Sequence, residues 1–262
     1  MDDLSVQVDI EPPTPGTDIV AEEDTLSTPV APVPVRPLSS LQERKLVEYL
    51  EEQFLDVTRN YKKRSDPSSS LPTLAAYLEA THRLLSFILQ IPPVDPSTPL
   101  RTALLLRLTS EVLQSIPGYA PDPNTLPALL AWLRDLDAGW LATLRADAWD
   151  SNASAARPAR ISSPPPPDAG GEDALDERRR EARVTRPSQT ERTRLRSALL
   201  AGTDALEEWL ERLDAGGAGE GFADALQRVG LEREFDDLFA GTLAEMGSLA
   251  GSEPVPSTKG MC

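Results

Sequence analysis

The chain has 262 residues, and its 26 Lys and Arg against 42 Asp and Glu give a formal net charge of −16. At roughly 100–200 residues per domain, this length accommodates one or two folded units. The negative charge argues against free nucleic acid as the main partner, so direct nucleic-acid binding by the whole chain is not expected, whereas protein partners are. One cysteine, Cys262, and one histidine, His82, exclude a disulfide framework and a cysteine- or histidine-based metal site within one chain.

No targeting signal is found in the sequence. The chain opens Met-Asp-Asp, without a basic n-region, a long apolar run or an Arg-rich presequence. We therefore expect no membrane association and a cytoplasmic or nuclear location.

Composition divides the chain into segments. Residues 1–38 carry a net charge of −7, seven prolines and no aromatic residue, so they bury too little apolar surface to offset the entropy of ordering. Residues 151–187 are also poor in apolar side chains and contain runs of Pro and Gly. We predict a disordered arm over 1–38, a helical bundle over 39–150, a disordered basic linker over 151–187, C-terminal helices over 188–250 and a disordered tail over 251–262.

Apolar spacing predicts four helices in the bundle. The first, over about 40–64, begins with a capping box of Ser40 and Glu43; the second begins near residue 74 and stops before Pro92. The third covers 99–116, and its apolar residues spread over about two thirds of its circumference at 100° per residue. It should therefore be buried on more than one side, either centrally or against a partner. Thr125 and Pro127 open the fourth helix.

A second capping box, Ser188 with Glu191, begins the C-terminal helices, which a glycine-rich loop at 216–219 divides into a hairpin. The fold class is therefore all-α: a four-helix bundle plus a C-terminal helical hairpin, with a disordered N-terminal arm and central linker. Beyond the loop, an apolar seam follows heptad spacing. Because the hairpin is too small to cover this seam, it should pack on the bundle or on another protein. We take four seam residues as interaction candidates: Phe235, Leu238, Phe239 and Leu243.

The sequence contains no P-loop, dinucleotide-binding turn, nucleophile elbow or metalloprotease helix, so we expect a non-enzymatic protein without catalytic residue, cofactor or metal. Its acidic clusters fall on polar helix faces, where solvated charge is the ordinary interpretation.

Asp137 falls inside the apolar stripe of the fourth helix, so its carboxylate needs a partner. Candidates for a buried ion pair are His82, Arg101 and Arg107. The alternative is a socket for a basic residue of another protein.

Two tryptophans, Trp132 and Trp149, lie off the stripe of the fourth helix. Exposed tryptophan is typical of an interface anchor, although Trp149 can also cap the bundle where the chain turns away.

Eight arginines fall within residues 178–196, with only two acidic residues. Such a stretch is typical of a nuclear import signal or a phosphate-contacting arm, and neutralisation of the acidic C-terminal segment explains it equally well. The residues assigned to targeting are Arg178, Arg179, Arg180, Arg183 and Arg186.

The run from Leu84 to Pro96, followed by Leu133 to Leu141, resembles a group of short helical proteins of filamentous fungi, some labelled meiotic recombination proteins. The resemblance covers about 39–150, contains no catalytic motif and implies a fungal source; the label would imply a nuclear role. A strand-exchange ATPase needs a phosphate-cradling loop that this sequence lacks. We therefore predict a helical adaptor or accessory subunit of a multiprotein complex, the alternative being a nuclear chromatin- or recombination-associated accessory factor.

Overall fold

A computed structural model describes residues 33–151, 153–161, 185–212, 227 and 232–251. The helices are α1 (Ser40–Lys62), α2 (Leu74–Leu89), α3 (Thr98–Ser115), a 3-10 turn η1 (Ile116–Gly118), α4 (Leu126–Arg145), α6 (Gln189–Glu211), α8 (Glu232–Asp236) and α9 (Ala240–Gly251). The strands have three residues each: β1 (Val33–Val35), β2 (Ala148–Asp150), β3 (Ala155–Arg157) and β4 (Ala159–Ile161). The all-α prediction is confirmed.

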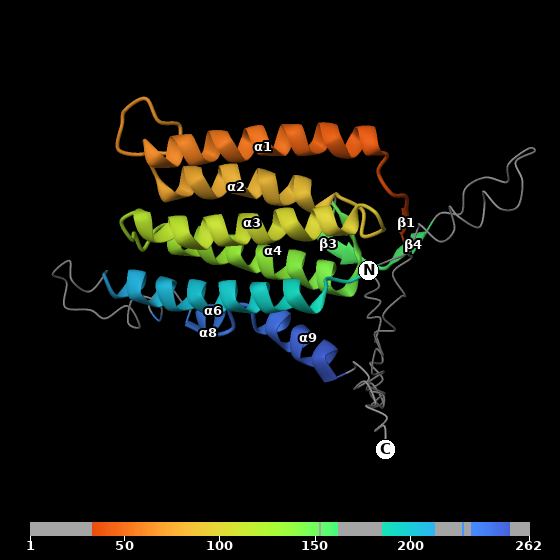
Figure 1. The fold of residues 1–262 in the computed structure, drawn as a ribbon. Coiled ribbons are helices and arrows are strands. Elements are labelled where there is room, and N and C mark those ends of the chain that lie inside the picture. The colour runs from red at the N-terminus through yellow and green to blue at the C-terminus, as the bar shows by residue number, and fades with distance from the viewer. Residues whose placement is uncertain (1–32, 152, 162–184, 213–226, 228–231, 252–262) are drawn as a thin grey trace, which may run out of the picture.

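The long helices lie side by side, with α1 at one edge (Figure 1). Going inward from α1, the next helix is α2, which packs on both α3 and α4; α6 then packs on α3, and α9 packs on α4. The third helix therefore has neighbours on several sides, as the wide spread of its apolar residues indicated. Of the two alternatives for this helix, the structure shows the central position.

The side chains that cap the helices explain where several of them begin. Ser39 and Gln42 form the capping box of α1, one residue before the predicted Ser40 and Glu43. The predicted box of Ser188 and Glu191 is confirmed at the start of α6. The prediction differs by one residue because serines occupy both 39 and 40, and either serine can cap a helix.

The C-terminal helices join the same hydrophobic core as α1 to α4. Leu195, Leu199, Leu206 and Leu210 of α6 are buried, and the Trp209 indole N–H donates to the Tyr119 carbonyl at 2.7 Å. This last contact puts the C-terminal end of α6 beside the C-terminal end of α3, so the two helices run parallel. The structure thus shows that these helices pack on the bundle.

Short strands form at one end of the bundle: β1 in the predicted arm, β3 and β4 in the predicted linker, and β2 in the last residues of the predicted bundle. β1 pairs in parallel with β4, and β2 pairs antiparallel with β3. Val35, Val94 and Ala148 form a small buried cluster there, which explains why residues 33–35 are ordered against the bundle. The predicted disorder is therefore wrong for 33–38, 151, 153–161, 185–187 and 251, which form part of the structure; residues 1–32, 152, 162–184 and 252–262 lie outside the described part.

A glycine sets the contact between α3 and α6. A Cβ atom on Gly202 would lie 2.4 Å from Leu113 Cδ1 and 3.1 Å from its Cβ. Such distances leave no room for a larger residue unless the buried Leu113 moves.

We expect Gly202→Leu to lower the free energy of unfolding by about 1–3 kcal/mol, because overpacking a filled contact forces neighbouring side chains to shift. Ala201→Leu is the matched control, since Ala201 is exposed on the same helix. Chemical denaturation of the full chain measures both, and adding Leu113→Ala should recover part of the loss. Equal effects at 201 and 202 would show that α6 does not pack closely here.

Candidate interaction surface

The edge helix α1 is buried on one side only. Its inward stripe includes Leu50, Phe54 and Val57, all buried. Its other side bears exposed apolar residues: Leu41 is 53% exposed, Tyr49 41% and Leu55 45%. Phe87 of α2 is 42% exposed beside them. We call these four residues the α1 face.

An aromatic pair lies near the middle of the α1 face. The rings of Tyr49 and Phe87 meet edge to face, with centroids 5.4 Å apart and planes at 69°. This geometry is favourable for aromatic rings and holds both side chains in place while much of their surface remains exposed. A preordered apolar surface loses little conformational entropy when another molecule covers it.

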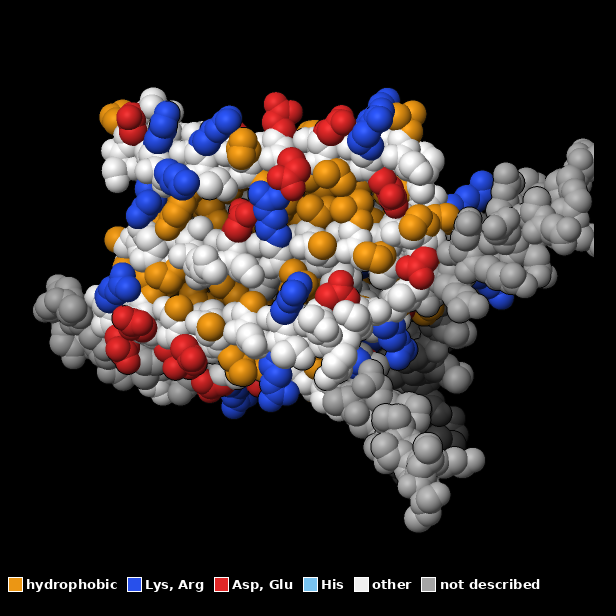
Figure 2. All heavy atoms as spheres, viewed as in Figure 1, with side chains coloured by type: hydrophobic (Ala, Val, Ile, Leu, Met, Phe, Trp, Pro, Cys, Tyr) orange, Lys and Arg blue, Asp and Glu red, His pale blue; other side chains and the backbone are white. Residues whose placement is uncertain are grey.

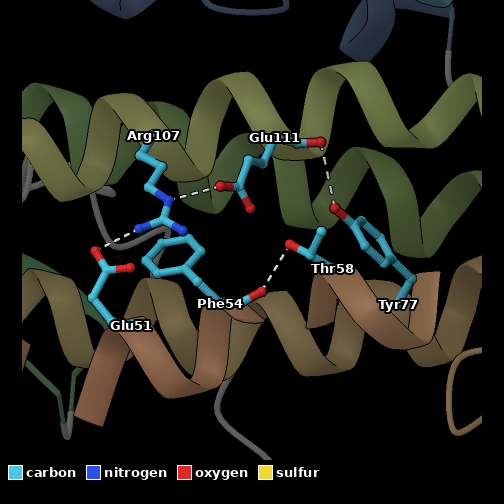
Figure 3. Close-up of polar contacts among 6 residues, drawn as sticks. All are labelled: Glu51, Phe54, Thr58, Tyr77, Arg107 and Glu111. Atoms are coloured by element: carbon cyan, nitrogen blue, oxygen red, sulfur yellow. Dashed lines mark hydrogen bonds and ion pairs between the residues drawn. The ribbon is translucent and has the colours of Figure 1, made fainter. Parts of the chain in front are cut away.

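An ionic cluster fastens α1 to α3 (Figure 3). The guanidinium of Arg107 donates to Glu51 of α1 at 2.6 Å and to Glu111 of α3 at 2.7 Å. The same group lies over the Phe54 ring, 4.2 Å from its centroid. Partial burial acts to lower the pKa of Arg107, but the bonds to both carboxylates outweigh it and raise that pKa. Arg107 therefore stays charged and bridges the two helices.

Figure 2 shows the surface on this side of the molecule. Charged side chains stand along α1, and hydrophobic side chains fill the strips between α1 and α3 and between α3 and α6. Arg107 reaches from α3 to Glu51 of α1. The bridge therefore lies over the buried ring of Phe54.

The predicted partners of Asp137 are wrong. His82 lies 3.0 Å from Asp135, Arg107 binds Glu51 and Glu111, and Arg101 donates to the backbone carbonyl of Asp147 at 2.8 Å. Asp137 is half-buried and accepts the backbone N–H of Thr242 at 3.1 Å.

Asp137 thus acts as a helix cap supplied by a neighbouring helix. Thr242 is in the first turn of α9, where backbone N–H groups have no partner within the helix. Gly241 allows the approach, because a Cβ there would lie 2.9 Å from Asp137 Oδ2. A carboxylate beside a helix N-terminus also interacts favourably with the helix dipole. The sequence correctly indicated that the Asp137 carboxylate lies on an inward face of α4. It could not show that the hydrogen-bond donor is a backbone N–H group.

The tryptophan prediction is wrong for Trp132, which is 3% exposed and belongs to the core. Its indole N–H has no hydrogen-bond partner in the part of the chain that the structure describes. Trp149 is half-buried in β2 and packs against the core, as expected of a residue that caps the bundle. Trp132 lies at the flank of the α4 stripe, and packing of α4 against several helices buries that flank as well.

The seam residues pack on the bundle and are not an open surface. Phe235 and Phe239 are buried, and Leu238 and Leu243 are half-buried. Beside them, α4, α8 and the residues that follow α8 line an open pocket of about 230 Å³. Among the residues lining it are Leu133, Arg134, Asp137, Arg233 and Leu238.

Of the predicted targeting stretch, Arg178, Arg179, Arg180 and Arg183 lie outside the described residues. Arg186 is described and exposed.

The α1 face was not predicted from the sequence, although the sequence contains a signal for it. Leu41, Tyr49 and Leu55 lie off the inward stripe of α1 at 100° per residue, so a full helical projection would have separated them from Leu50 and Phe54. No sequence signal could have shown that Phe87 lies beside Tyr49.

Comparison with protein-family models, with curated proteins and with solved structures finds no match to this chain. The resemblance of residues 39–150 to fungal proteins therefore stays a prediction. No helix in the described ranges is long and apolar enough to cross a membrane. The same residues contain no group of three or more His, Cys, Asp or Glu side chains arranged to hold a metal ion.

The capping role of Asp137 gives a test. We expect Asp137→Ala to lower the free energy of unfolding by about 1 kcal/mol, the usual effect of losing a cap, and to speed proteolysis within α9. Asp135→Ala is the control two residues away, because it breaks an exposed pair worth less than about 1 kcal/mol and leaves α9 untouched. If both variants are cut equally fast in α9, Asp137 does not hold that helix.

Proposed function

We propose that this protein is a helical adaptor or accessory subunit of a multiprotein complex, without enzymatic activity, and that it binds a protein through the α1 face. The observation that carries this proposal is the gathering of exposed apolar side chains at one edge. Of the five large hydrophobic residues that are exposed among the described residues, all but Leu200 belong to the α1 face.

The chemistry of the α1 face supports protein binding. Aromatic side chains are enriched among residues that dominate binding energy, because they bury a large area and lose few rotamers. Charged side chains surround them, including Arg44 and Glu48, which form an exposed pair at 3.8 Å. An apolar centre with a charged rim is the usual anatomy of a protein interface.

The α1 face can lose its aromatic groups without loss of fold, because both rings are over 40% exposed. We expect Tyr49→Ser with Phe87→Ser to weaken partner binding at least tenfold, as removal of hot-spot residues does. The double variant should keep the helical circular dichroism of the wild type. Crosslinking and affinity purification of the tagged full chain from its own cells measures which partners are retained.

Leu200→Ser is the matched control for this experiment, since Leu200 is 48% exposed on α6, away from the α1 face. Partners that both variants retain do not use the α1 face. If every stable partner belongs to that class, the proposed surface is wrong.

The arginines of residues 178–196 favour a second candidate, a nuclear chromatin- or recombination-associated accessory factor. Within that stretch Arg186, Arg194 and Arg196 are exposed and available to another molecule. Clustered arginines bind acidic receptors and phosphates through paired hydrogen bonds.

We expect a fluorescent fusion of the full chain to accumulate in the nucleus, and replacement of Arg178, Arg179 and Arg180 by Gln to abolish accumulation. Gln replacement of Arg44, Arg59 and Arg83 removes the same charge elsewhere and should leave the location unchanged. A cytoplasmic wild-type fusion would exclude the nuclear candidate.

A further inference from the structure

The outer side of α1 has a pattern that complements itself. Leu41, Glu48 and Leu55 follow one another at intervals of seven residues. Because an α-helix drifts only about 20° per seven residues, the three lie along one line on the exposed side of α1. Glu48 is thus at the midpoint, with one exposed leucine two turns away on either side.

We propose that a second copy of this chain packs on the α1 face, with its α1 antiparallel to the first and the two-fold axis at Glu48. In this arrangement Leu41 of each copy meets Leu55 of the other, which gives two leucine contacts. This dimer rests on the proposed function only in that both place a protein on the α1 face. The dimer makes a second copy of the chain that protein.

The charges beside this line support the antiparallel arrangement. In an antiparallel pair related by a two-fold axis, each flank of one helix faces the same flank of the other. Lys45 and Glu52 are exposed on one flank, three residues before and four residues after Glu48. Lys45 of each copy therefore faces Glu52 of the other, so the flank carries two opposite-charge contacts.

The other flank has the same complementarity. Arg44 would face Glu51 of the second copy, and Glu51 stays partly available because its side chain is 52% exposed while it binds Arg107. Lys45 and Glu52 make no ion pair with any other described residue, which leaves both free to bind across the axis.

The aromatic pair lies close to the proposed axis. Tyr49 follows Glu48 directly and shares the flank of Lys45 and Glu52, so the Tyr49 and Phe87 rings of both copies would meet beside the axis. Of the charged residues Arg44, Lys45, Glu48, Glu51 and Glu52, only Glu48 opposes itself. Its own Arg44, 3.8 Å away, reduces that repulsion. An interface of one helix pair is small, so the dimer should be weak and depend on concentration.

Charge exchange tests the arrangement directly. We expect sedimentation velocity of the full chain to show a monomer–dimer equilibrium over about 1–500 µM, the range suited to a small interface. Lys45→Glu alone or Glu52→Lys alone should weaken association roughly tenfold, because each puts like charges opposite one another at two places. An equimolar mixture of the two variants should associate as well as the wild type, since each Glu then faces a Lys.

Two controls separate pairing from net charge. Glu207→Lys on α6 makes the same charge change as Glu52→Lys at an exposed site away from α1, and it should leave association unchanged. In a Cys262→Ser background, Glu48→Cys should form a disulfide-linked dimer on oxidation, because residues at a two-fold axis face each other. Glu207→Cys should stay monomeric.

A wild-type chain that remains monomeric up to 500 µM would overturn the proposal, and so would a variant mixture that associates no better than its components. Failure of the proposed function would give a different combination of results. If the chain is monomeric but Tyr49→Ser with Phe87→Ser loses another partner, the α1 face still binds a protein and only the second copy is wrong. If the dimer forms and no other partner depends on Tyr49 and Phe87, the second copy is the occupant of this face.

Discussion

Burial of α3 against α2, α4 and α6 is the constraint on which the remaining structure depends. Most polar groups of a helix covered on several sides are hydrogen-bonded within the protein, although Thr98 Oγ1 and Arg101 Nε and Nη2 have no hydrogen-bond partner among the described residues. Thr102 and Thr109 donate to the carbonyls of Thr98 and Leu105, and Thr109 also accepts the Trp140 indole N–H at 2.9 Å. Arg101 is fully buried, and burial lowers its pKa to about 10, while nearby Asp147 acts to raise it. It stays charged at neutral pH and binds the backbone that follows α4.

Because α3 occupies the centre, the outer helices differ in how much of their surface is covered. α4 is covered by α2, α3 and α9, which explains why even the off-stripe Trp132 is buried. α1 contacts mainly α2 and is tied to α3 by Arg107. Its first turn is held by the Ser39 and Gln42 capping box, so Leu41 is presented on formed helix. Among the described residues, α1 is the long helix with an uncovered apolar side, and a capping box and one ionic cluster add to its packing on α2.

Local patterns in the sequence predicted the features that depend on local physics. Apolar spacing located α1 to α4 and α6, and the Ser188 capping box marked the start of α6. Features that depend on long-range packing could not be predicted from local patterns. Three of them join residues distant in sequence: the backbone cap that Asp137 provides for α9, the contact of Tyr49 with Phe87, and the pairing of β1 with β4. Asp137 shows the limit, because its inward position was readable but its partner was not.

Strand β4 ends at Ile161, and the chain is described again from Thr185, whose hydroxyl binds Asp95 just before α3. Both points belong to the end of the bundle where α4 stops and α6 begins. Ile161 and Thr185 therefore lie at the same end of the bundle. Closing a flexible loop costs only about 0.6 kcal/mol more for each doubling of its length, so a connection between two points at one end tolerates a change in length at little cost to the fold. A reporter domain inserted between residues 162 and 184 should accordingly leave the described helices in place.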